Sequence, residues 1–458
     1  MRILHLVHRW LPAHRAGVES YVAALATAQA GTGHEVAVLT AVKDVARRDG
    51  NLTETEIEGL RTFEIVNNLV HDDFRETWNH PGIGARMAEA VARFEPDVLH
   101  VHQLMNLSAA HLGALGVTAV MSLHDFWLSC PRFGHRYHPR GETCEETSRE
   151  RCGGCMTRLA WSQPGPERAA ARIVSGLARA GLDASGPLTR AARRLRGGRS
   201  DASFEQPVAD EWQPMAEALA ERDAALRSEV VPSIQLFLAS SRFVGDRLVE
   251  WGLPRDRVRL HRTGVETARF AEATRQRGFA KGVLRVGFLG TLAAHKGAGL
   301  LLEAWEAARL GGSAELEIRG DASHHPGLAA DLDRAARACG ATLGEALGRD
   351  QVPGWLAGLD LLVVPSLWWE NAPFVVLEAQ AAGTPVMVAG TGGMPELVEE
   401  GRDGWVFRVG DAGDLASHLT RLIADPELLA SCRAEETPGV DIAEDAVACV
   451  ALYAEAMR

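Results

Sequence analysis

The sequence has no long apolar run, no excess of basic residues and no leader-like start. Its longest apolar stretches, such as residues 359–364, have the length of a buried strand and fall far short of the roughly 18–20 residues that span a bilayer. The 458 residues carry a net charge of −12, which gives no general attraction to nucleic acid. Residues 1–8 look like a strand and lack the regions of a secretory signal. We therefore expect a cytoplasmic protein with no transmembrane segment and no nucleic-acid partner.

The chain is too long for one hydrophobic core, so two or three domains are expected. In the first half, apolar runs at 3–7, 35–40, 98–101 and 118–123 alternate with helix-forming stretches at 19–30, 83–93 and 107–115. The second half repeats this pattern, with strand-like runs at 284–289, 315–318, 361–364 and 385–389 and helix-forming stretches near 297–308, 325–339 and 372–382. Such alternation predicts an α/β fold with two Rossmann-like, doubly wound domains.

We place the first domain at residues 1–270 and the second at 283–442, because a polar, strand-poor stretch lies near 270–281. The sequence leaves open whether the final helix, residues 443–458, crosses back to the first domain. Doubly wound sheets bind ligands beyond the carboxyl ends of their strands. Two such domains facing each other would form an interdomain cleft that can hold two substrates.

Two glutamates follow the predicted strand at 361–364. Glu370 and Glu378 are eight positions apart, and the intervening Asn371 and Pro373 favour a helix start, with Asn at the cap and Pro in the first turn. Free amides at a helix start can hold a diphosphate, while the carboxylates can accept hydrogen bonds from sugar and ribose hydroxyls. Two such carboxylates alone are more often solvated helix residues, so the surrounding motifs decide the interpretation.

Those motifs extend over most of the chain. In the second half they are Glu370-Asn371-Ala372-Pro373-Phe374, Ala382-Gly383-Thr384-Pro385 and Gly392-Gly393-Met394-Pro395-Glu396. With Gly17-Val18-Glu19, Leu99-His100-Val101-His102 and Ala239-Ser240-Ser241-Arg242 in the first half, they resemble the family 4 glycosyltransferases of the GT-B fold. Members of that family are retaining enzymes that use nucleotide-sugar donors, generally without a metal in catalysis. The resemblance implies a retaining, hexosyltransferase-like enzyme with a nucleotide diphosphate sugar as donor and no cofactor required for catalysis.

The same resemblance assigns roles to residues. Glu370 would contact hydroxyls of the donor sugar and Glu378 the ribose. Backbone amides from Asn371 to Phe374, a stretch that includes Ala372 and Pro373, would cover the diphosphate. The base would be read near Leu343 and Gly344, largely by backbone and shape.

Gly290-Thr291-Leu292 followed by His295-Lys296-Gly297 matches the family's Gly-Arg-Leu and Lys-Gly element, whose two cations neutralise the departing diphosphate. Only Lys296 is kept, and it is predicted as the main catalytic cation because charge on the diphosphate grows as the sugar leaves. Thr291 stands where arginine is expected, which removes a fixed fork of donors for phosphate. The candidates to replace that arginine are Arg262, Arg319 and His295.

His124 and Gly17 are the expected contributions of the first domain. The resemblance places His124, in Ser122-Leu123-His124-Asp125-Phe126, against the donor sugar; a core or strand-end histidine is the alternative. Gly17 follows Ala16, where the family often has a second glycine. It would let the loop after the first strand approach the diphosphate or the acceptor.

A loop at about 126–156 contains four of the seven cysteines, which are Cys130, Cys144, Cys152 and Cys155. Four thiolates can hold a tetrahedral structural zinc. A subset of the family has a similar Cys-rich loop after a His-Asp-Phe-Trp stretch, matched here by residues 124–127. Because the spacing is not a known finger pattern, reduced free thiols are the alternative.

An arginine-rich insert follows at about 157–230. Nine arginines and two acids between residues 157 and 199 give a local charge of +7. Arg168, Arg172 and Arg179 fall on one face of a helical piece, which suggests peripheral contact with an anionic membrane at its inner face, near a lipid-linked acceptor. A solvated face over an internal helix pair is the commoner alternative.

The sequence thus predicts a glycosyltransferase in glycan, glycolipid or glycosylated-metabolite biosynthesis, with the acceptor held mainly by the first domain. It names neither the base nor the sugar, and the acceptor could be a sugar, a lipid-linked molecule or a small molecule. Two other functions stay open. One is a phosphorylase-like or epimerase-like enzyme on the same architecture. The other is a non-catalytic sugar-nucleotide sensor or partner subunit, which the threonine at position 291 favours.

Overall fold

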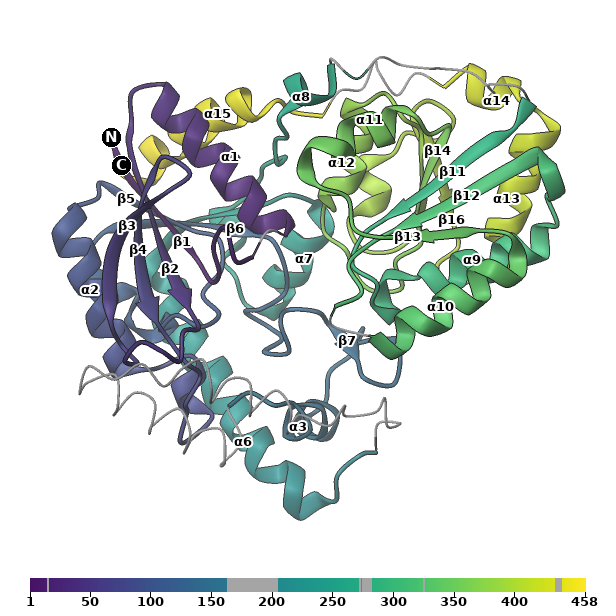
Figure 1. Ribbon diagram of the computed structural model, residues 1–458. Coiled ribbons are helices and arrows are strands. Elements are labelled where there is room, and N and C mark those ends of the chain that lie inside the picture. Colours follow the sequence, from purple (N-terminus) through teal and green to yellow (C-terminus); the bar gives the residue numbers. More distant parts are fainter. Residues whose placement is uncertain (15, 163–204, 272, 274–281, 324–325, 433–438) are drawn as a thin grey trace.

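The structure is a computed structural model that describes residues 1–458 except 15, 163–204, 272, 274–281, 324–325 and 433–438. Two sheets, each covered by helices, lie side by side, and the chain crosses between them twice (Figure 1). This is the arrangement of two Rossmann-like, doubly wound domains that the alternating pattern predicts.

The first sheet has eight strands in the order β10-β9-β6-β5-β1-β2-β4-β3. Its strands are parallel except for β3, which pairs antiparallel with β4 at the edge. The bounds are β1 (Arg2–Val7), β2 (Glu35–Val42), β3 (Leu52–Ile57), β4 (Leu60–Val66), β5 (Val98–Val101), β6 (Thr118–Leu123), β9 (Ile234–Ala239) and β10 (Val258–Leu260).

Helices cover both faces of this sheet. They are α1 (Gly17–Gly31), α2 (Pro81–Phe94), α6 (Ala209–Ala225), α7 (Arg242–Trp251) and the last helix of the chain, α15 (Ile442–Ala456). The loop after β6 carries a two-stranded hairpin of β7 (Tyr137–His138) and β8 (Glu142–Thr143), followed by α3 (Arg149–Thr157), which packs on α6. Helix α15 lies against α1 and against β6 and β9.

The second sheet has six strands, all parallel, in the order β13-β12-β11-β14-β15-β16. They are β11 (Leu284–Leu289), β12 (Ala314–Arg319), β13 (Thr342–Gly344), β14 (Leu361–Val364), β15 (Val386–Ala389) and β16 (Gly404–Phe407). The helices are α8 (Thr267–Ala271), α9 (Ala298–Ala308), α10 (Pro326–Cys339), α11 (Val352–Ala357), α12 (Phe374–Ala381), α13 (Ala412–Ala424) and α14 (Glu427–Ala430).

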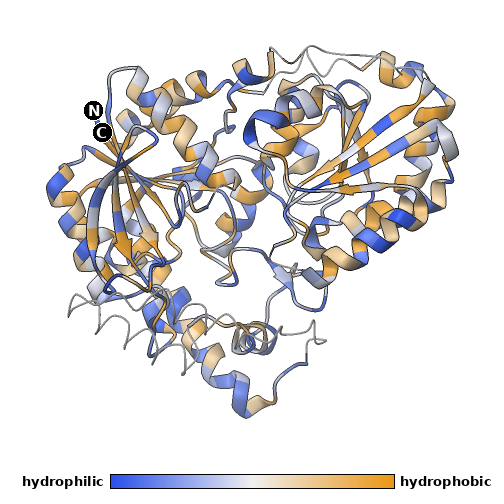
Figure 2. Ribbon diagram, viewed as in Figure 1, coloured by the Kyte–Doolittle hydropathy of each residue, from blue (hydrophilic) through white to orange (hydrophobic). Residues whose placement is uncertain are grey.

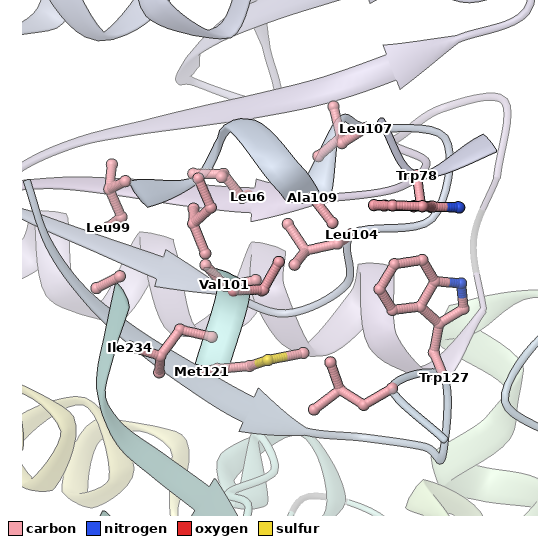
Figure 3. Packing of buried hydrophobic residues seen from close by; sticks show 14 of the residues in the cluster. Leu6, Trp78, Leu99, Val101, Leu104, Leu107, Ala109, Met121, Trp127 and Ile234 are labelled. Carbon is pink, nitrogen blue, oxygen red and sulfur yellow. The ribbon is translucent and has the colours of Figure 1, made fainter. Parts of the chain in front are cut away.

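Apolar residues concentrate on the strands and on the helix faces that meet them (Figure 2). Beyond the carboxyl end of β6, the core continues into the following loop, where Trp127 is buried with Trp78 and Leu104 (Figure 3). The fully buried Arg222 of α6 stacks on the Trp127 ring and donates to the carbonyls of Trp127 and Leu128, at 2.6 and 3.0 Å. This contact fixes the start of the Cys-rich loop.

Two sequence interpretations need correction. Residues 107–115 were expected to be helical, but they form two 3₁₀ turns, Ala109–His111 and Gly113–Leu115, because Gly113 and a left-handed Gly116 interrupt the segment. The hairpin of β3 and β4 was not predicted, since the polar residues of β3 hide the strand pattern. Within the described ranges, no helix is both long enough and apolar enough to cross a bilayer.

Candidate active site

Lys296 and Glu370 meet beyond the carboxyl ends of β11 and β14. The Lys296 ammonium donates to Glu370 Oε1 at 2.6 Å, and Ser366 Oγ donates to the same oxygen at 2.9 Å. Gly297 makes this approach possible, because it has φ +77° and any Cβ would lie 1.9 Å from the carbonyl oxygen of Pro365. The Lys-Gly pair therefore places the cation against the loop that carries the carboxylate.

The Glu370 carboxylate is kept ionised in a buried place. Burial favours its neutral form, but the Lys296 charge and the hydrogen bonds from Lys296 and Ser366 outweigh burial and lower its pKa. The Lys296 side chain is 26% exposed and the Glu370 side chain 9%. The lysine thus remains accessible to a ligand while it neutralises the glutamate.

Asn371 has a different role from the helix cap expected for it. Helix α12 begins at Phe374 with Pro373 as N-cap, and the buried Asn371 side chain reaches into the first domain. Asn371 Nδ2 donates to the Leu123 carbonyl oxygen at 2.6 Å, and its Oδ1 accepts from Ser241 Oγ at 2.6 Å. Asn371 therefore joins the loop between β14 and α12 to Leu123, the last residue of β6, which directly precedes His124.

A second bridge lies beside Asn371. The Glu396 carboxylate accepts from the backbone amides of Arg242 and Phe243, both at 2.8 Å, and so caps the start of α7 from the other domain. Gly393 permits the contact, because its Cβ would lie 2.3 Å from the Asn371 carbonyl oxygen and 2.5 Å from Ser241 Oγ. The Gly-Gly-Met-Pro-Glu motif is thus a domain-joining element.

The start of α12 faces the start of α1. A Cβ on Gly17 would lie 2.6 Å from the Phe374 ring, whose other neighbour is Tyr21, with ring centroids 5.6 Å apart. Gly17 therefore permits close contact of the two helix starts. Among the described hydrogen bonds, none uses the backbone amides of Phe374 or Val375, so both can serve an anion.

Glu378 lies one turn further along α12 and is half-buried. Burial raises its pKa to about 7, against the opposing charges of Arg269 and Arg349. Both arginines also pair with Glu266. This carboxyl group can therefore gain or lose its proton near neutral pH.

A cavity of about 410 Å³ opens beyond the carboxyl ends of β12 and β13. Its lining includes Leu343 and Gly344, the residues expected near the base. The remaining lining residues are Leu292, Gly320, Asp321, Ala322, Ser323, Glu345 and Ala346. Such a position suits a nucleobase, because ligands of doubly wound sheets bind at these strand ends.

In the loop from Gly290 to Lys296, Thr291 occupies the position of the expected arginine. Gly290 donates to the Arg319 carbonyl oxygen, and Thr291 is exposed. Arg319 pairs with Glu317, with Nε 2.8 Å from Oε1. His295 lies in a cluster of rings formed by His135, Tyr137 and Trp368, at centroid distances of 4.9–5.8 Å. Arg262 is exposed in the loop after β10, while His295 directly precedes Lys296 in the chain. Which group replaces the arginine stays a prediction.

His124 follows β6 in the first domain and is partly buried. Burial lowers its pKa to about 4, so the ring is neutral at physiological pH. Its Nε2 lies 3.0 Å from His102 Nδ1. Through Leu123 and Asn371 its backbone is connected to the loop that carries Glu370, so the structure brings His124, Lys296 and Glu370 to the same interdomain region.

The Cys-rich loop crosses from the first domain to the second. Thr143 Oγ1 donates to the Leu367 carbonyl oxygen at 2.9 Å, and the Arg136 guanidinium lies over the Trp369 ring. Sequence reasoning gave no role to this hairpin. Its contacts place it over the segment that leads to Glu370.

The four cysteines of this loop are free thiols that lie near one another. Burial, together with the neighbouring thiols of Cys130, Cys144 and Cys155, raises the pKa of Cys152 to about 12. Clusters of three potential ligands within 4.8 Å occur elsewhere in the described chain, but these cysteines form none. The described positions of these four thiols therefore give no support to a zinc site. Zinc binding by this loop is a prediction from the sequence alone.

The predicted membrane-binding face, with Arg168, Arg172 and Arg179, lies outside the described residues and also stays a prediction. Ser241, Ser366 and Glu396 were not singled out as site residues. Two of them stand within motifs that had been recognised, Ser240-Ser241-Arg242 and Gly-Gly-Met-Pro-Glu. The motif was visible, but the partner across the domain boundary was not.

Two family matches divide between the two sheets. Residues 15–153 match the family described as Glycosyltransferase Family 4, and residues 283–425 match the family described as Glycosyl transferases group 1. A D-inositol 3-phosphate glycosyltransferase from Streptomyces bingchenggensis is 40% identical over 115 residues, which are 24% of this chain and 25% of the relative. The amylovoran biosynthesis glycosyltransferase AmsK from Erwinia amylovora is 30% identical over 199 residues, 41% of this chain and 47% of the relative. The chain thus aligns with half or less of the length of these relatives.

Solved structures share the complete fold. Sucrose-phosphate synthase from Thermosynechococcus elongatus superposes with a TM-score of 0.64 at 16% identity and covers 99% of this chain and 98% of its own. HepE from Anabaena, in complex with UDP and glucose, superposes with a TM-score of 0.61 at 15% identity, covering 99% and 100%. The two family matches together take in more than half of the residues, and they contain the Lys-Gly element and the Glu370 motif. The chain belongs to the group 1/family 4 glycosyltransferases.

Proposed function

We propose that this protein is a retaining glycosyltransferase that moves a sugar from a nucleotide diphosphate donor to an acceptor. The donor lies on the second domain (283–442) and the acceptor mainly on the first (1–270). The observation that carries the proposal is the meeting of Lys296, Glu370 and the start of α12 beyond the carboxyl ends of β11 and β14, with His124 opposite. Lys296 and the start of α12 suit the diphosphate of such a donor, and Glu370 suits its sugar.

The reaction requires groups that stabilise opposite charges on neighbouring parts of the donor. The bond between the anomeric carbon and the phosphate oxygen breaks, so negative charge grows on the diphosphate and positive charge on the sugar ring. Lys296 and the free amides of Phe374 and Val375 would stabilise the diphosphate, while Glu370 would accept hydrogen bonds from sugar hydroxyls. A separation of 2.6 Å between Lys296 and Glu370 fits this division of roles, because the sugar and the diphosphate are joined by a single bond.

We further propose that the cavity beside Leu343 and Gly344 takes the base and that Glu378 binds the ribose. Uridine is the first base to test, because HepE of the same fold is known in complex with UDP and glucose. A thermal-shift series with UDP, GDP, ADP and CDP identifies the base. A ligand at about 100 times its Kd adds about 2.7 kcal/mol of stability, so the correct base stands out.

A non-catalytic sugar-nucleotide-binding subunit is the second candidate, because Thr291 replaces a family arginine. The deciding experiment incubates the purified chain with the donor that its base preference selects and measures release of nucleoside diphosphate. The variant Lys296→Met serves as the control for contaminating activity. Turnover by the natural chain that is lost in the variant supports the transferase. Binding of donor without any turnover supports the sensor.

A further inference from the structure

A row of buried polar side chains connects His124 to the interior of the first domain. His124 Nε2 lies 3.0 Å from His102 Nδ1, and His102 Nε2 lies 2.9 Å from His5 Nδ1. His5 Nε2 then lies 2.8 Å from Gln29 Oε1. These residues come from β1, from α1 and from the ends of β5 and β6, so the row runs across neighbouring strands of the first sheet.

The row continues to the last helix of the chain. Gln29 Nε2 donates to the Tyr453 hydroxyl at 3.0 Å, and that hydroxyl lies 2.7 Å from His100 Nδ1. His100 Nε2 lies 2.8 Å from Ser122 Oγ. Tyr453 belongs to α15, so a residue near the end of the chain orients the amide on which the row begins.

The histidines of the row have no nitrogen left for a metal ion. His5, His100 and His102 form a buried group whose ligand atoms lie within 4.8 Å of one another. Each of their six ring nitrogens, however, already makes one of the hydrogen bonds just described. Hydrogen bonding accounts for the cluster completely.

All four histidines are neutral near pH 7. Burial lowers the pKa of His5 and of His124 to about 4, and it lowers the pKa values of His100 and His102 well below the ordinary value. A neutral imidazole has one nitrogen that donates and one that accepts. A ring that donates through one nitrogen must therefore accept through the other, so the direction of one hydrogen bond determines the direction of the next.

We infer that Gln29, oriented by Tyr453, sets the tautomer of His124. The amide oxygen of Gln29 can only accept, so His5 carries its proton on Nε2 and accepts at Nδ1. His102 then donates through Nε2 and accepts at Nδ1, and His124 donates through Nε2. The row leaves Nδ1 of His124 as an unprotonated acceptor.

This assignment says what the His124 side chain can recognise, on the proposed function that it faces the donor sugar. Within the described part of the chain, Nδ1 of His124 makes no hydrogen bond with protein. A neutral acceptor there suits a sugar hydroxyl that donates its proton and does not suit a phosphate oxygen. Gln29, His5, His102 and Tyr453 are then positioning residues, since they act on the sugar only through His124.

The test reads the tautomer directly by nitrogen NMR of the full chain labelled with ¹⁵N-histidine, with His124→Gln used to assign the signal. The expected result is an Nε2–H tautomer of His124 that is unchanged between pH 6 and pH 8. In Tyr453→Phe the amide of Gln29 loses its orienting partner, and we expect the His124 signals to shift towards a mixture of tautomers. An Nδ1–H tautomer in the natural protein would overturn the inference.

Tyr21→Phe is the matched control. Tyr21 is also buried, and its hydroxyl donates to Asp445 of α15 at 3.0 Å. Its ring packs against those of His102 and His124, at centroid distances of 5.9 and 5.5 Å, but none of the described hydrogen bonds joins it to the row, and the phenylalanine keeps the ring. We expect Tyr21→Phe to leave the tautomer unchanged; an equal effect of both tyrosine variants would contradict the inference. If Tyr453→Phe does not fold, Gln29→Met replaces it, because the thioether removes the amide oxygen that accepts from His5, and the His124 signals should again shift towards a mixture of tautomers. The NMR readout needs no substrate, so its failure is separate from a failure to find transferase turnover.

Discussion

Replacement of Lys296 by methionine should damage stability and catalysis by separate amounts. The variant leaves the Glu370 carboxylate, 9% exposed, without its cation. Breaking a fully buried pair costs about 3–5 kcal/mol. Because the Lys296 side chain is 26% exposed, water screens part of this loss, and we expect about 2–3 kcal/mol. That corresponds to a fall in Tm of about 5–10 °C for a domain of this size.

The pH dependence of this loss has a definite sign. In the natural protein the lowered pKa of Glu370 contributes stability that is present above the unfolded pKa and is lost as pH falls through the folded pKa. Without Lys296, burial dominates and raises that pKa instead. The destabilisation of Lys296→Met should therefore be greatest at neutral pH and shrink under acid, where Glu370 is protonated. Thermal unfolding from pH 4 to pH 8 measures it.

A double variant separates the two roles. Lys296→Met with Glu370→Gln removes both charges, so stability should return to within about 1 kcal/mol of the natural protein. Turnover should stay low, because one preorganised electrostatic donor is worth about 100- to 1,000-fold. Recovery of turnover in the double variant would refute a catalytic role for Lys296. Unchanged stability of Lys296→Met would show that the pair does not form in the free protein.

Four further predictions concern the second domain and the Cys-rich loop. Since burial raises the pKa of Glu378 to about 7, Glu378→Gln should raise Tm by a few degrees at pH 8, by less as pH falls, and by nothing below about pH 4, where the carboxyl group is protonated in the folded and the unfolded chain alike; calorimetry checks this. The nucleoside diphosphate affinity of the natural protein should rise with pH through 7, because ribose hydroxyls donate to the ionised carboxylate; a rise of equal size in Glu378→Gln would assign the effect to the phosphate. Gly297→Ala should lower both stability and turnover, whereas Gly299→Ala in α9, whose added Cβ would lie 3.9 Å from the Leu332 side chain of α10, should be tolerated in both assays. The zinc prediction requires close to one zinc per chain in protein purified without a metal-affinity column, and a metal-free, folded and active preparation contradicts it.

The sequence predicts the interior of each domain better than the contacts between them. The strands at 98–101, 118–123, 284–289 and 361–364 coincide with their apolar runs, because a parallel strand covered on both faces must be apolar along its whole length. The helix start between Glu370 and Glu378 was also predicted, since proline favours that position. These features depend on residues that are close in sequence.

The role of Asn371 depends instead on Leu123 and Ser241, which are 248 and 130 positions away. No local pattern distinguishes such an asparagine from a helix cap. The histidines at positions 5, 100, 102 and 124 likewise look like separate strand residues in the sequence. They form a row only because β1, β5 and β6 are adjacent in the sheet. The arrangement of such side chains follows from the order of strands, which periodicity does not reveal.

The bridges made by Asn371 and Glu396 have a consequence for the timing of the catalytic cycle. They join the two domains at the residues next to Glu370, so any widening of the gap between the sheets breaks them together. Such a rupture also releases the end of β6 and hence the backbone of His124. The complete set of reactive groups then exists only while the domains are closed. In the open protein a bound donor would face Lys296 and Glu370 without His124, so transfer would wait for the domains to close.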